Sequence, residues 1–309
     1  MTASPLIRRV SSNHSLLDIE HLPTERILAL LKLAQRMRTA KSSSLLRGKT
    51  VALLFYEPST RTRVSFELAA KKLGATTTVV TAAESSIEKG ESLVDTVRTL
   101  RAAGVDAIVI RHPSSGAPNL AARHLDIPVI NAGDGMHEHP SQALLDAFTI
   151  LRHKKRLRGL QVAMIGDILH SRVARSNIHL LSRLGAQVTL CGPPQLAPDI
   201  CATLAAGVTV IRHIEQAIRH ADVIMMLRVQ KERLAGLQLD AHDYVARYQL
   251  NSERLRLAKR EALVMHPGPA ILGMELTSEV SDGTQSVILE QVANGIPVRM
   301  AILAKALGR

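Results

Sequence analysis

Short apolar segments alternate with amphipathic helical patterns along most of this chain, and this alternation constrains the fold more than any other feature. The strand-like segments cover residues 50–55, 76–81, 105–110 and 127–130, then 161–166, 187–190, 208–211, 223–226 and 263–265. Such alternation predicts parallel sheets whose strands are joined by crossover helices. The two groups of strands, which are separated by a long helical pattern from Pro140 to about Arg152, indicate two such sheets.

The intervening segments carry apolar residues at helical spacing. The predicted helices cover residues 24–37, 61–73, 91–103, 117–124, 140–152, 171–184, 214–220, 251–258 and 286–307. We therefore predict an α/β fold with two doubly wound parallel-sheet domains joined by helices. One domain comprises 1–138 and 287–309, and the other comprises 139–286. We expect the substrate cleft between the domains, at the carboxyl ends of the strands.

Composition narrows the functional class. At 309 residues and 46% hydrophobic content, the chain can form two substantial cores. It contains no apolar run of membrane-spanning length, no apolar segment typical of a secretory signal, and only two cysteines, Cys191 and Cys201, so we expect a cytoplasmic protein without a disulfide framework. The net charge of +12 comes with only 2% aromatic residues, which disfavours nucleic acid and favours small anionic substrates.

The segment Phe55–Glu67 joins the first predicted strand to the helix that follows it. Its central residues are Ser59, Thr60, Arg61, Thr62 and Arg63. A turn with a capping hydroxyl leads into a helix start, where free N–H groups, the helix dipole and guanidinium charge favour a dianion such as phosphate. Arg61 and Arg63 point in different directions; Arg63 can pair with Glu67, which leaves Arg61 for the ligand. An ordinary capped helix with solvated arginines is the alternative.

This Ser-Thr-Arg-Thr-Arg segment closely resembles the carbamoyl phosphate signature of the carbamoyltransferases. The resemblance extends over nearly the whole chain, with the motifs in family order. It implies that Ser59, Thr60, Arg61 and Thr62 bind carbamoyl phosphate, together with Arg111, which follows the strand 105–110. A strand-end arginine in water is the alternative for Arg111 when that pattern is taken alone.

The segment His139-Pro140-Ser141-Gln142 is the second strong match. Pro140 suits a first helical turn and holds His139 extended at the cap position. His139 and Gln142 can then present N–H donors at one point, as in an oxyanion-type site. The resemblance implies that His139 polarises the carbamoyl carbonyl and that Gln142 holds the carbamoyl amide. His137 lies nearby, but no third ligand follows at recognisable spacing, so we predict no metal; no organic cofactor is implied.

Two further arginines follow strands of the second group. Ser171 can cap a helix whose first residue, Arg172, suits a carboxylate, although a solvated first-turn arginine is equally compatible with the pattern. A dinucleotide-binding turn is disfavoured because no G-x-G-x-x-G is present. The segment from Arg228 to Arg233 matches the Arg-x-Gln-x-Glu-Arg signature of the aspartate branch of the family. The resemblance implies that Arg172, Arg228 and Gln230 bind aspartate, whereas ornithine enzymes carry a different loop.

His266-Pro267-Gly268-Pro269 ends the last predicted strand. We expect backbone carbonyl groups near Gly268 to face the attacking amine, and we predict a cis bond between Gly268 and Pro269. Aspartate enzymes have His-Pro-x-Pro at this point. The chain departs from the family directly afterwards, where Ile271-Leu272 stands in place of the usual Asn-Arg, so a loop arginine is missing.

The resemblance also implies an assembly. In the family, a serine and a lysine from the loop after the second strand reach the active site of the neighbouring subunit, and Ser85 and Lys89 hold those places here. We therefore expect a homotrimer with shared active sites, in which Lys89 contributes to catalysis and to aspartate binding. A regulatory or dihydroorotase-like partner chain stays open, and neither nucleic acid nor membrane is expected as a partner.

Together these matches imply transfer of the carbamoyl group from carbamoyl phosphate to the amine of L-aspartate. The products would be N-carbamoyl-L-aspartate and phosphate, an early step of de novo pyrimidine biosynthesis. Three alternatives are left open at this point: a carbamoyltransferase for another amino acid such as ornithine, a dehydrogenase-like nucleotide binder, and a non-catalytic paralogous subunit.

Overall fold

The computed structural model describes residues 14–39, 43–81, 90–229, 236–237 and 239–308. The chain divides into two compact units. The first comprises Met1–Asp18, Ala29–Gly135 and Ile296–Arg309, and the second comprises Ile19–Leu28 and Met136–Gly295. Each unit contains one parallel sheet with helices packed against it, which confirms the predicted α/β class with two parallel-sheet domains.

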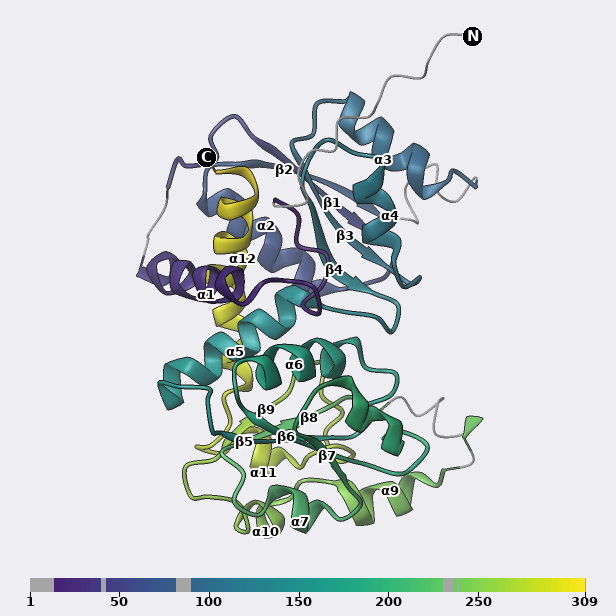
Figure 1. Cartoon of the computed structure of the whole chain (residues 1–309), viewed down its shortest axis with the longest axis vertical. Coiled ribbons are helices and arrows are strands. Elements are labelled where there is room, and N and C mark those ends of the chain that lie inside the picture. The colour runs from purple at the N-terminus through teal and green to yellow at the C-terminus, as the bar shows by residue number, and fades with distance from the viewer. Residues whose placement is uncertain (1–13, 40–42, 82–89, 230–235, 238, 309) are drawn as a thin grey trace. The chain divides into compact units, whose positions relative to one another are not determined.

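The first unit is built on a four-stranded sheet with the order β2-β1-β3-β4. Its strands are β1 (Thr50–Phe55), β2 (Thr76–Thr81), β3 (Ala107–His112) and β4 (Val129–Asp134). The helices α2 (Thr60–Lys72), α3 (Leu93–Ala102) and α4 (Ala117–Arg123) connect these strands. Figure 1 shows α2 on one side of the sheet and α3 and α4 on the other. Apolar side chains of the central strands, among them Leu54 and Ile108, are fully buried under α3 and α4.

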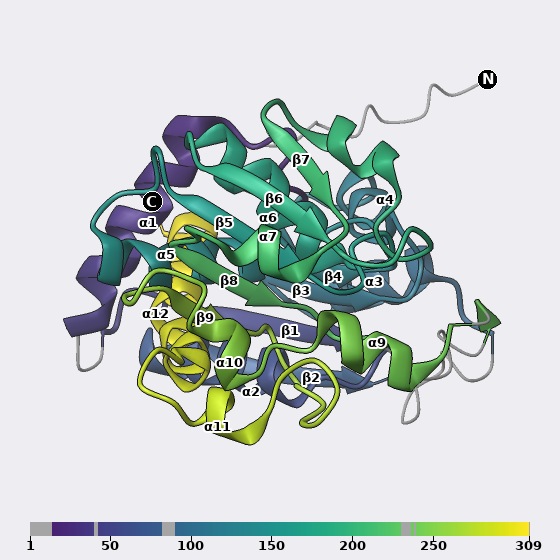
Figure 2. The ribbon, with the colours of Figure 1, turned by 90° about the horizontal axis from the view of Figure 1, so that it is seen from below.

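The second unit is built on a five-stranded sheet with the order β7-β6-β5-β8-β9, which is visible strand by strand in Figure 2. Its strands are β5 (Gln161–Ile165), β6 (Gln187–Cys191), β7 (Val208–Ile211), β8 (Val223–Met226) and β9 (Leu263–Met265). All neighbouring strands are parallel. The helix α6 (Arg172–Arg183) lies on one face of this sheet, whereas α7 (Ile214–Ile218) and α10 (Ser252–Leu255) lie on the other (Figure 1).

Further helices complete the chain. They are α1 (Thr24–Thr39), α5 (Pro140–Lys154), the 3-10 helix η3 (Asp199–Leu204), α9 (Ala241–Tyr248), α11 (Ser278–Ser281) and α12 (Ile288–Leu307). Within the described ranges, none of the helices combines the length and the apolar character needed to cross a membrane.

The segment Ile19–Leu28 groups with the second unit because polar contacts attach it there. The carboxylate of Glu138 accepts hydrogen bonds from the backbone N–H groups of Ile19 and Glu20. The guanidinium of Arg183 donates to the carbonyl oxygens of Ile19, Glu20 and Leu22. These contacts satisfy backbone N–H and C=O groups on a segment that buries Ile19 and Leu22.

All nine predicted strands are present, but two of them begin two residues later than predicted and also end later. The strand predicted at 105–110 lies at Ala107–His112, and the one predicted at 127–130 lies at Val129–Asp134. In each case polar residues continue the backbone ladder beyond the apolar run, so hydrophobicity alone does not mark the strand end. The helices α9 and α11 and the 3-10 helix were not predicted, because they are short and follow no long apolar period.

Candidate functional site

The Ser-Thr-Arg-Thr-Arg segment occupies the turn from β1 into α2. Ser59 stands at the N-cap position of α2, but its side chain forms no capping hydrogen bond, which corrects the expectation of a capping hydroxyl. Arg63 N–H is bonded to Ser59 O at 3.2 Å, so the N–H groups of the preceding residues in the turn have no helical acceptor. Thr60 and Arg61 are exposed, and Thr62 is buried. The turn therefore keeps hydroxyl, N–H and guanidinium groups for an anion.

The expected ion pair between Arg63 and Glu67 is replaced by another. Glu67 pairs instead with Lys71 on the next turn of α2, with an Oε1 to Nζ distance of 2.6 Å. Arg63 and Lys71 both lie one helical turn from Glu67, so the spacing permits either ion pair. In the pair that forms, the glutamate lies N-terminal to the lysine, which is the orientation that the helix dipole favours. Glu67 therefore does not hold Arg63 away from an anion, and both arginines of this turn are candidates for binding it.

Arg111 lies beside this turn because of sheet register. β3 pairs with β1 in parallel, which places Arg111 next to Phe55, the last residue of β1. The backbone N–H of Tyr56 donates to the carbonyl oxygen of Arg111 at 2.9 Å. The guanidinium Nε of Arg111 lies 3.2 Å from a carboxylate oxygen of Glu57. Sequence patterns did not single out Glu57, although it is the first polar residue of the turn.

In the second unit, His139 and Gln142 lie at the start of α5. His139 is the N-cap residue and Pro140 the first helical residue, as predicted. The backbone N–H of His139 donates to Ser176 Oγ at 2.8 Å, and Ser176 Oγ donates to Glu138 at 2.6 Å. These contacts hold the start of α5 against α6. His139 is only 4% exposed, so its ring lies in a largely desolvated environment where a hydrogen bond to a ligand is strengthened.

Gln142 is not arranged as a second donor beside His139. Its amide Nε2 donates to Oδ1 of Asp146 at 3.0 Å, one helical turn further along α5. A carboxylate accepts hydrogen bonds, so this contact determines which end of the amide is nitrogen. The remaining end, the carbonyl oxygen, is an acceptor. The expectation of two donors at one point is therefore corrected for Gln142.

Arg172 and Arg228 follow neighbouring strands of the five-stranded sheet. β5 and β8 are paired with Ile165 opposite Met226, so the residues after these two strands share one sheet edge. Gly166 makes the turn out of β5 with φ +125°, where a Cβ would stand 2.8 Å from the carbonyl oxygen of Leu227. The glycine thus permits close approach of the two chain segments that lead to the arginines.

Arg172 and Arg228 differ in the contacts that hold their backbone and in their exposure. Ser171 caps α6 through a 3.1 Å hydrogen bond from Ala174 N–H, as expected, and this cap positions Arg172 at the first residue of the helix. Arg172 is half-buried, whereas Arg228 is exposed. Gln230 lies outside the described residues, as do Ser85 and Lys89.

The loop after β9 carries the Gly268–Pro269 peptide bond in the cis form, which confirms that prediction. β9 pairs with β8, so this loop lies at the same sheet edge as Arg228. The backbone N–H of Gly268 donates to Nδ1 of the buried His266 at 2.9 Å. Ile271 and Leu272 stand where the family usually has Asn-Arg. Ile271 packs against the core of the unit, and Leu272 is exposed.

Glu275 is a buried carboxylate that the sequence patterns did not single out. Its Oε1 accepts from Val229 N–H at 2.9 Å and its Oε2 from Ile271 N–H at 2.5 Å. Burial raises the pKa of Glu275, although these backbone hydrogen bonds act in the opposite direction. His266 Nε2 lies 3.9 Å from Oε2. Glu275 thus holds together the loop after β8 and the loop after β9.

One cluster of metal-ligating residue types is present among the described residues. Ligand atoms of Glu20, His137 and Glu138 lie within 4.8 Å of one another. Glu20 lies far from His137 in the sequence, so local spacing could not reveal the cluster. The carboxylate of Glu138 already accepts three hydrogen bonds, from Ile19 N–H, Glu20 N–H and Ser176 Oγ. We therefore assign a structural role to Glu138 and no metal to the cluster.

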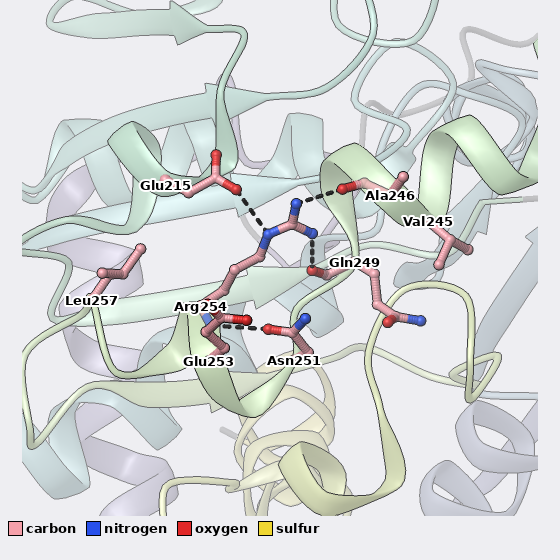
Figure 3. Close-up of a pocket in the computed structure, with 8 residues that line it drawn as sticks. All are labelled: Glu215, Val245, Ala246, Gln249, Asn251, Glu253, Arg254 and Leu257. Atoms are coloured by element: carbon pink, nitrogen blue, oxygen red, sulfur yellow. Dashed lines mark hydrogen bonds and ion pairs between the residues drawn. The ribbon is translucent and has the colours of Figure 1, made fainter.

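A separate pocket of about 450 Å³ lies near α9 and α10 and contains none of the predicted site residues (Figure 3). Arg254 crosses it, pairing with Glu215 at 2.8 Å and donating to the carbonyl oxygens of Gln249 and Ala246. Each of the three guanidinium nitrogens is bonded to a protein oxygen, and the charge is paired with Glu215, so the pocket favours no anion. We interpret it as a structural junction.

Two family descriptions match the chain and together cover most of it. "Aspartate/ornithine carbamoyltransferase, carbamoyl-P binding domain" matches residues 14–152. "Aspartate/ornithine carbamoyltransferase, Asp/Orn binding domain" matches residues 158–306.

Individual relatives agree with these matches. The chain is 64% identical to the aspartate carbamoyltransferase catalytic subunit of Koribacter versatilis, over 96% of this chain and 97% of the relative. Among solved structures, it is similar to aspartate transcarbamoylase from Trypanosoma cruzi in complex with N-(phosphonacetyl)-L-aspartic acid, with a TM-score of 0.86 and 32% identity over 96% of each chain. It is also similar to ornithine carbamoyltransferase from Pyrococcus furiosus, with a TM-score of 0.87 and 30% identity over 96% of this chain and 97% of the other.

Proposed function

This chain belongs to the aspartate/ornithine carbamoyltransferase family, and we propose that it transfers the carbamoyl group of carbamoyl phosphate to the amine of L-aspartate. The products are N-carbamoyl-L-aspartate and phosphate, and the reaction is an early step of de novo pyrimidine biosynthesis. The proposal assigns carbamoyl phosphate binding to residues 1–138 with 287–309, and aspartate binding to residues 139–286. Sequence identity to the Koribacter relative, at 64%, is about twice that to the ornithine enzyme, at 30%.

The observation that carries the choice of aspartate is the pairing of β5 with β8, which puts Arg172 and Arg228 after neighbouring strands. L-Aspartate offers two carboxylates, and each suits a guanidinium group. The side chain of ornithine ends in an ammonium group, which two arginines at one sheet edge would repel. Gln230 completes the proposed aspartate set.

The turn from β1 into α2 supports the binding of carbamoyl phosphate. In the proposed complex, Ser59, Thr60 and the first-turn N–H groups donate to phosphate oxygens, and Arg61 adds positive charge. Arg111, beside them through sheet register, is proposed to compensate the charge that grows on the leaving phosphate. Lys89 and Ser85 are proposed to arrive from a neighbouring subunit.

The proposed reaction proceeds by direct attack. The aspartate amine forms a bond to the carbamoyl carbon, and the carbonyl oxygen becomes a tetrahedral oxyanion stabilised by His139 and Thr62. The bond from carbon to the phosphate oxygen then breaks, and the departing phosphate takes the proton from the amine. Gln142 accepts a hydrogen bond from the carbamoyl NH₂, and backbone carbonyls near Gly268 orient the amine. Positioning and charge stabilisation supply the rate, without a covalent enzyme intermediate.

We further propose a homotrimer with shared active sites, as the family resemblance implies, in the cytoplasm. The free, buried thiols of Cys191 and Cys201 fit a reducing compartment. Light scattering during size-exclusion chromatography measures the mass of the assembly. A dominant monomer at micromolar concentration would contradict the shared-site proposal.

A direct assay tests the reaction. The purified chain is incubated with carbamoyl phosphate and either L-aspartate or L-ornithine, and the carbamoylated product is measured. We expect N-carbamoyl-L-aspartate in the first mixture and no citrulline in the second. Citrulline in the second mixture would favour the ornithine alternative, and no product in either mixture would favour a non-catalytic subunit.

A further inference from the structure

Asp146 lies one helical turn after Gln142 on α5, and the structure places both side chains on the same face of that helix. The distance from Gln142 Nε2 to Asp146 Oδ1 is 3.0 Å. Asp146 is fully buried and Gln142 is 7% exposed. The two residues therefore form a contact that solvent does not compete for.

The carboxylate of Asp146 accepts from the side-chain amides of three residues on three helices. Besides Gln142, Gln291 of α12 donates to Oδ1 at 2.8 Å and Asn177 of α6 donates to Oδ2 at 2.8 Å. Each of these amides must therefore present its nitrogen to the carboxylate and its carbonyl oxygen elsewhere. For Gln291 that oxygen is used, since it accepts from the backbone N–H of His266 at 2.9 Å.

The carbonyl oxygen of Gln142 differs from that of Gln291, because no residue within the described part of the chain donates to it. A nearly buried amide oxygen that accepts no hydrogen bond carries a free-energy cost, and a hydrogen-bond donor on a bound ligand would remove that cost. In carbamoyl phosphate that donor is the NH₂ group, which acyl phosphates such as acetyl phosphate lack.

We propose that Asp146 is a positioning residue that determines which end of the Gln142 amide faces the ligand, and thereby makes the site selective for a carbamoyl group over an acyl group. This inference rests on the proposed function. Without the buried carboxylate, the Gln142 amide can turn over and present its NH₂, which repels the NH₂ of the substrate. Asn177 and Gln291 hold the carboxylate in place from α6 and α12.

The test compares two phosphonates that differ only in the group on the carbonyl carbon, which is the group that Gln142 is proposed to contact. Phosphonoacetamide carries the NH₂ of carbamoyl phosphate, and 2-oxopropylphosphonate carries a methyl group instead. Their dissociation constants, measured by titration calorimetry on the full chain, give a selectivity ratio. A general loosening of the fold weakens both ligands alike and leaves this ratio unchanged, so the ratio reports the orientation of Gln142.

We expect wild type to bind phosphonoacetamide more tightly, and we expect Asp146→Asn to lower the ratio by about tenfold. Asp146→Ala is the second variant, because it removes the acceptor without setting a new amide against the three that meet there. Asn177→Ala is the matched control: it is equally buried and removes a donor from Oδ2, but it leaves the Gln142 contact to Oδ1 intact. Its ratio should stay within about threefold of wild type.

An unchanged ratio in a folded Asp146 variant overturns the inference, and so does an equal fall in Asn177→Ala. The wild-type assay with aspartate separates this result from the proposed function. If wild type forms N-carbamoyl-L-aspartate while the ratio does not respond to Asp146, only the positioning role fails. If wild type forms no product, the proposed function fails first.

Discussion

The carboxylate of Glu275 accepts a 2.9 Å hydrogen bond from the backbone N–H of Val229, the residue that follows Arg228. Its second oxygen accepts from Ile271 N–H, in the loop after β9. Glu275 is fully buried, and its two acceptors serve backbone groups from two loops at one sheet edge. The position of the exposed Arg228 thus depends on a side chain that lies 47 residues further along the chain.

Replacing Glu275 by Gln should therefore impair aspartate binding. The Gln side chain keeps one acceptor and sets an NH₂ group against the other backbone N–H. We expect the free energy of unfolding to fall by about 1–3 kcal/mol. We also expect the KM for aspartate to rise while the KM for carbamoyl phosphate changes little. Urea unfolding and steady-state kinetics measure these effects; equal increases in both KM values would argue against a specific role for Glu275 in the Arg228 loop.

Substitutions of Arg61 and Arg63 can decide which of the two arginines binds the anion. The sequence assigned the anion to Arg61 because Arg63 was expected to pair with Glu67, but Glu67 pairs with Lys71. If Arg61 stabilises the charge on the leaving phosphate, Arg61→Ala should lower kcat by about 10²–10³-fold. Its effect on the KM for carbamoyl phosphate should be smaller. Arg63→Ala, on the same helix turn, is the control and should retain most of the turnover. A large loss only in Arg63→Ala would reverse the assignment.

The cap at the start of α6 allows a test of the proposed role of Arg172, because it stabilises the helix that Arg172 begins. Ser171 Oγ accepts from Ala174 N–H at 3.1 Å, so Ser171→Ala should lower the free energy of unfolding by about 1 kcal/mol. Because Arg172 is the next residue, the KM for aspartate should rise as well. Ser171→Thr keeps the hydroxyl and serves as the control. A loss of stability with an unchanged KM would separate Arg172 from the cap.

Asp222 should make the free energy of unfolding depend on pH in the acidic range. Burial acts to raise its pKa, but hydrogen bonds from Gln161 N–H and Lys259, together with the lysine charge, bring the pKa below its ordinary value of 3.8. A carboxyl group whose pKa is lower in the folded state stabilises the fold above the unfolded pKa. This contribution is lost as the pH falls through the folded pKa.

We therefore expect wild type to exceed Asp222→Asn in unfolding free energy by about 1–3 kcal/mol at pH 7, and the difference to shrink below about pH 3.8. Chemical denaturation between pH 2.5 and pH 7 measures this. The exposed Asp282→Asn is the control and should show no such change. A difference that is the same at pH 3 and pH 7 would exclude the carboxylate as its source.

Much of the fold was predictable because its determinants are local. All nine strands and the longer helices follow from runs of apolar residues and from helical spacing. The cap positions of Ser171 and His139 follow from residue type and from the proline after His139. The short helices α9 and α11 were not predicted, whereas the equally short α7 and α10 lie within the segments 214–220 and 251–258, whose apolar spacing predicted helices.

Residues close together in the chain specify the two sets of parallel strands and the chemical character of each turn that follows them. Which of several possible partners a charged or amide group takes depends on how the elements pack. Glu67 pairs with Lys71 although Arg63 stands at the same helical spacing, Gln142 turns its nitrogen to Asp146, and Glu275 joins two loops that are far apart in the chain. These outcomes depend on competition among several partners in space. A buried carboxylate attracts whichever N–H groups the packed helices and strands bring to it, and no local spacing records that arrangement.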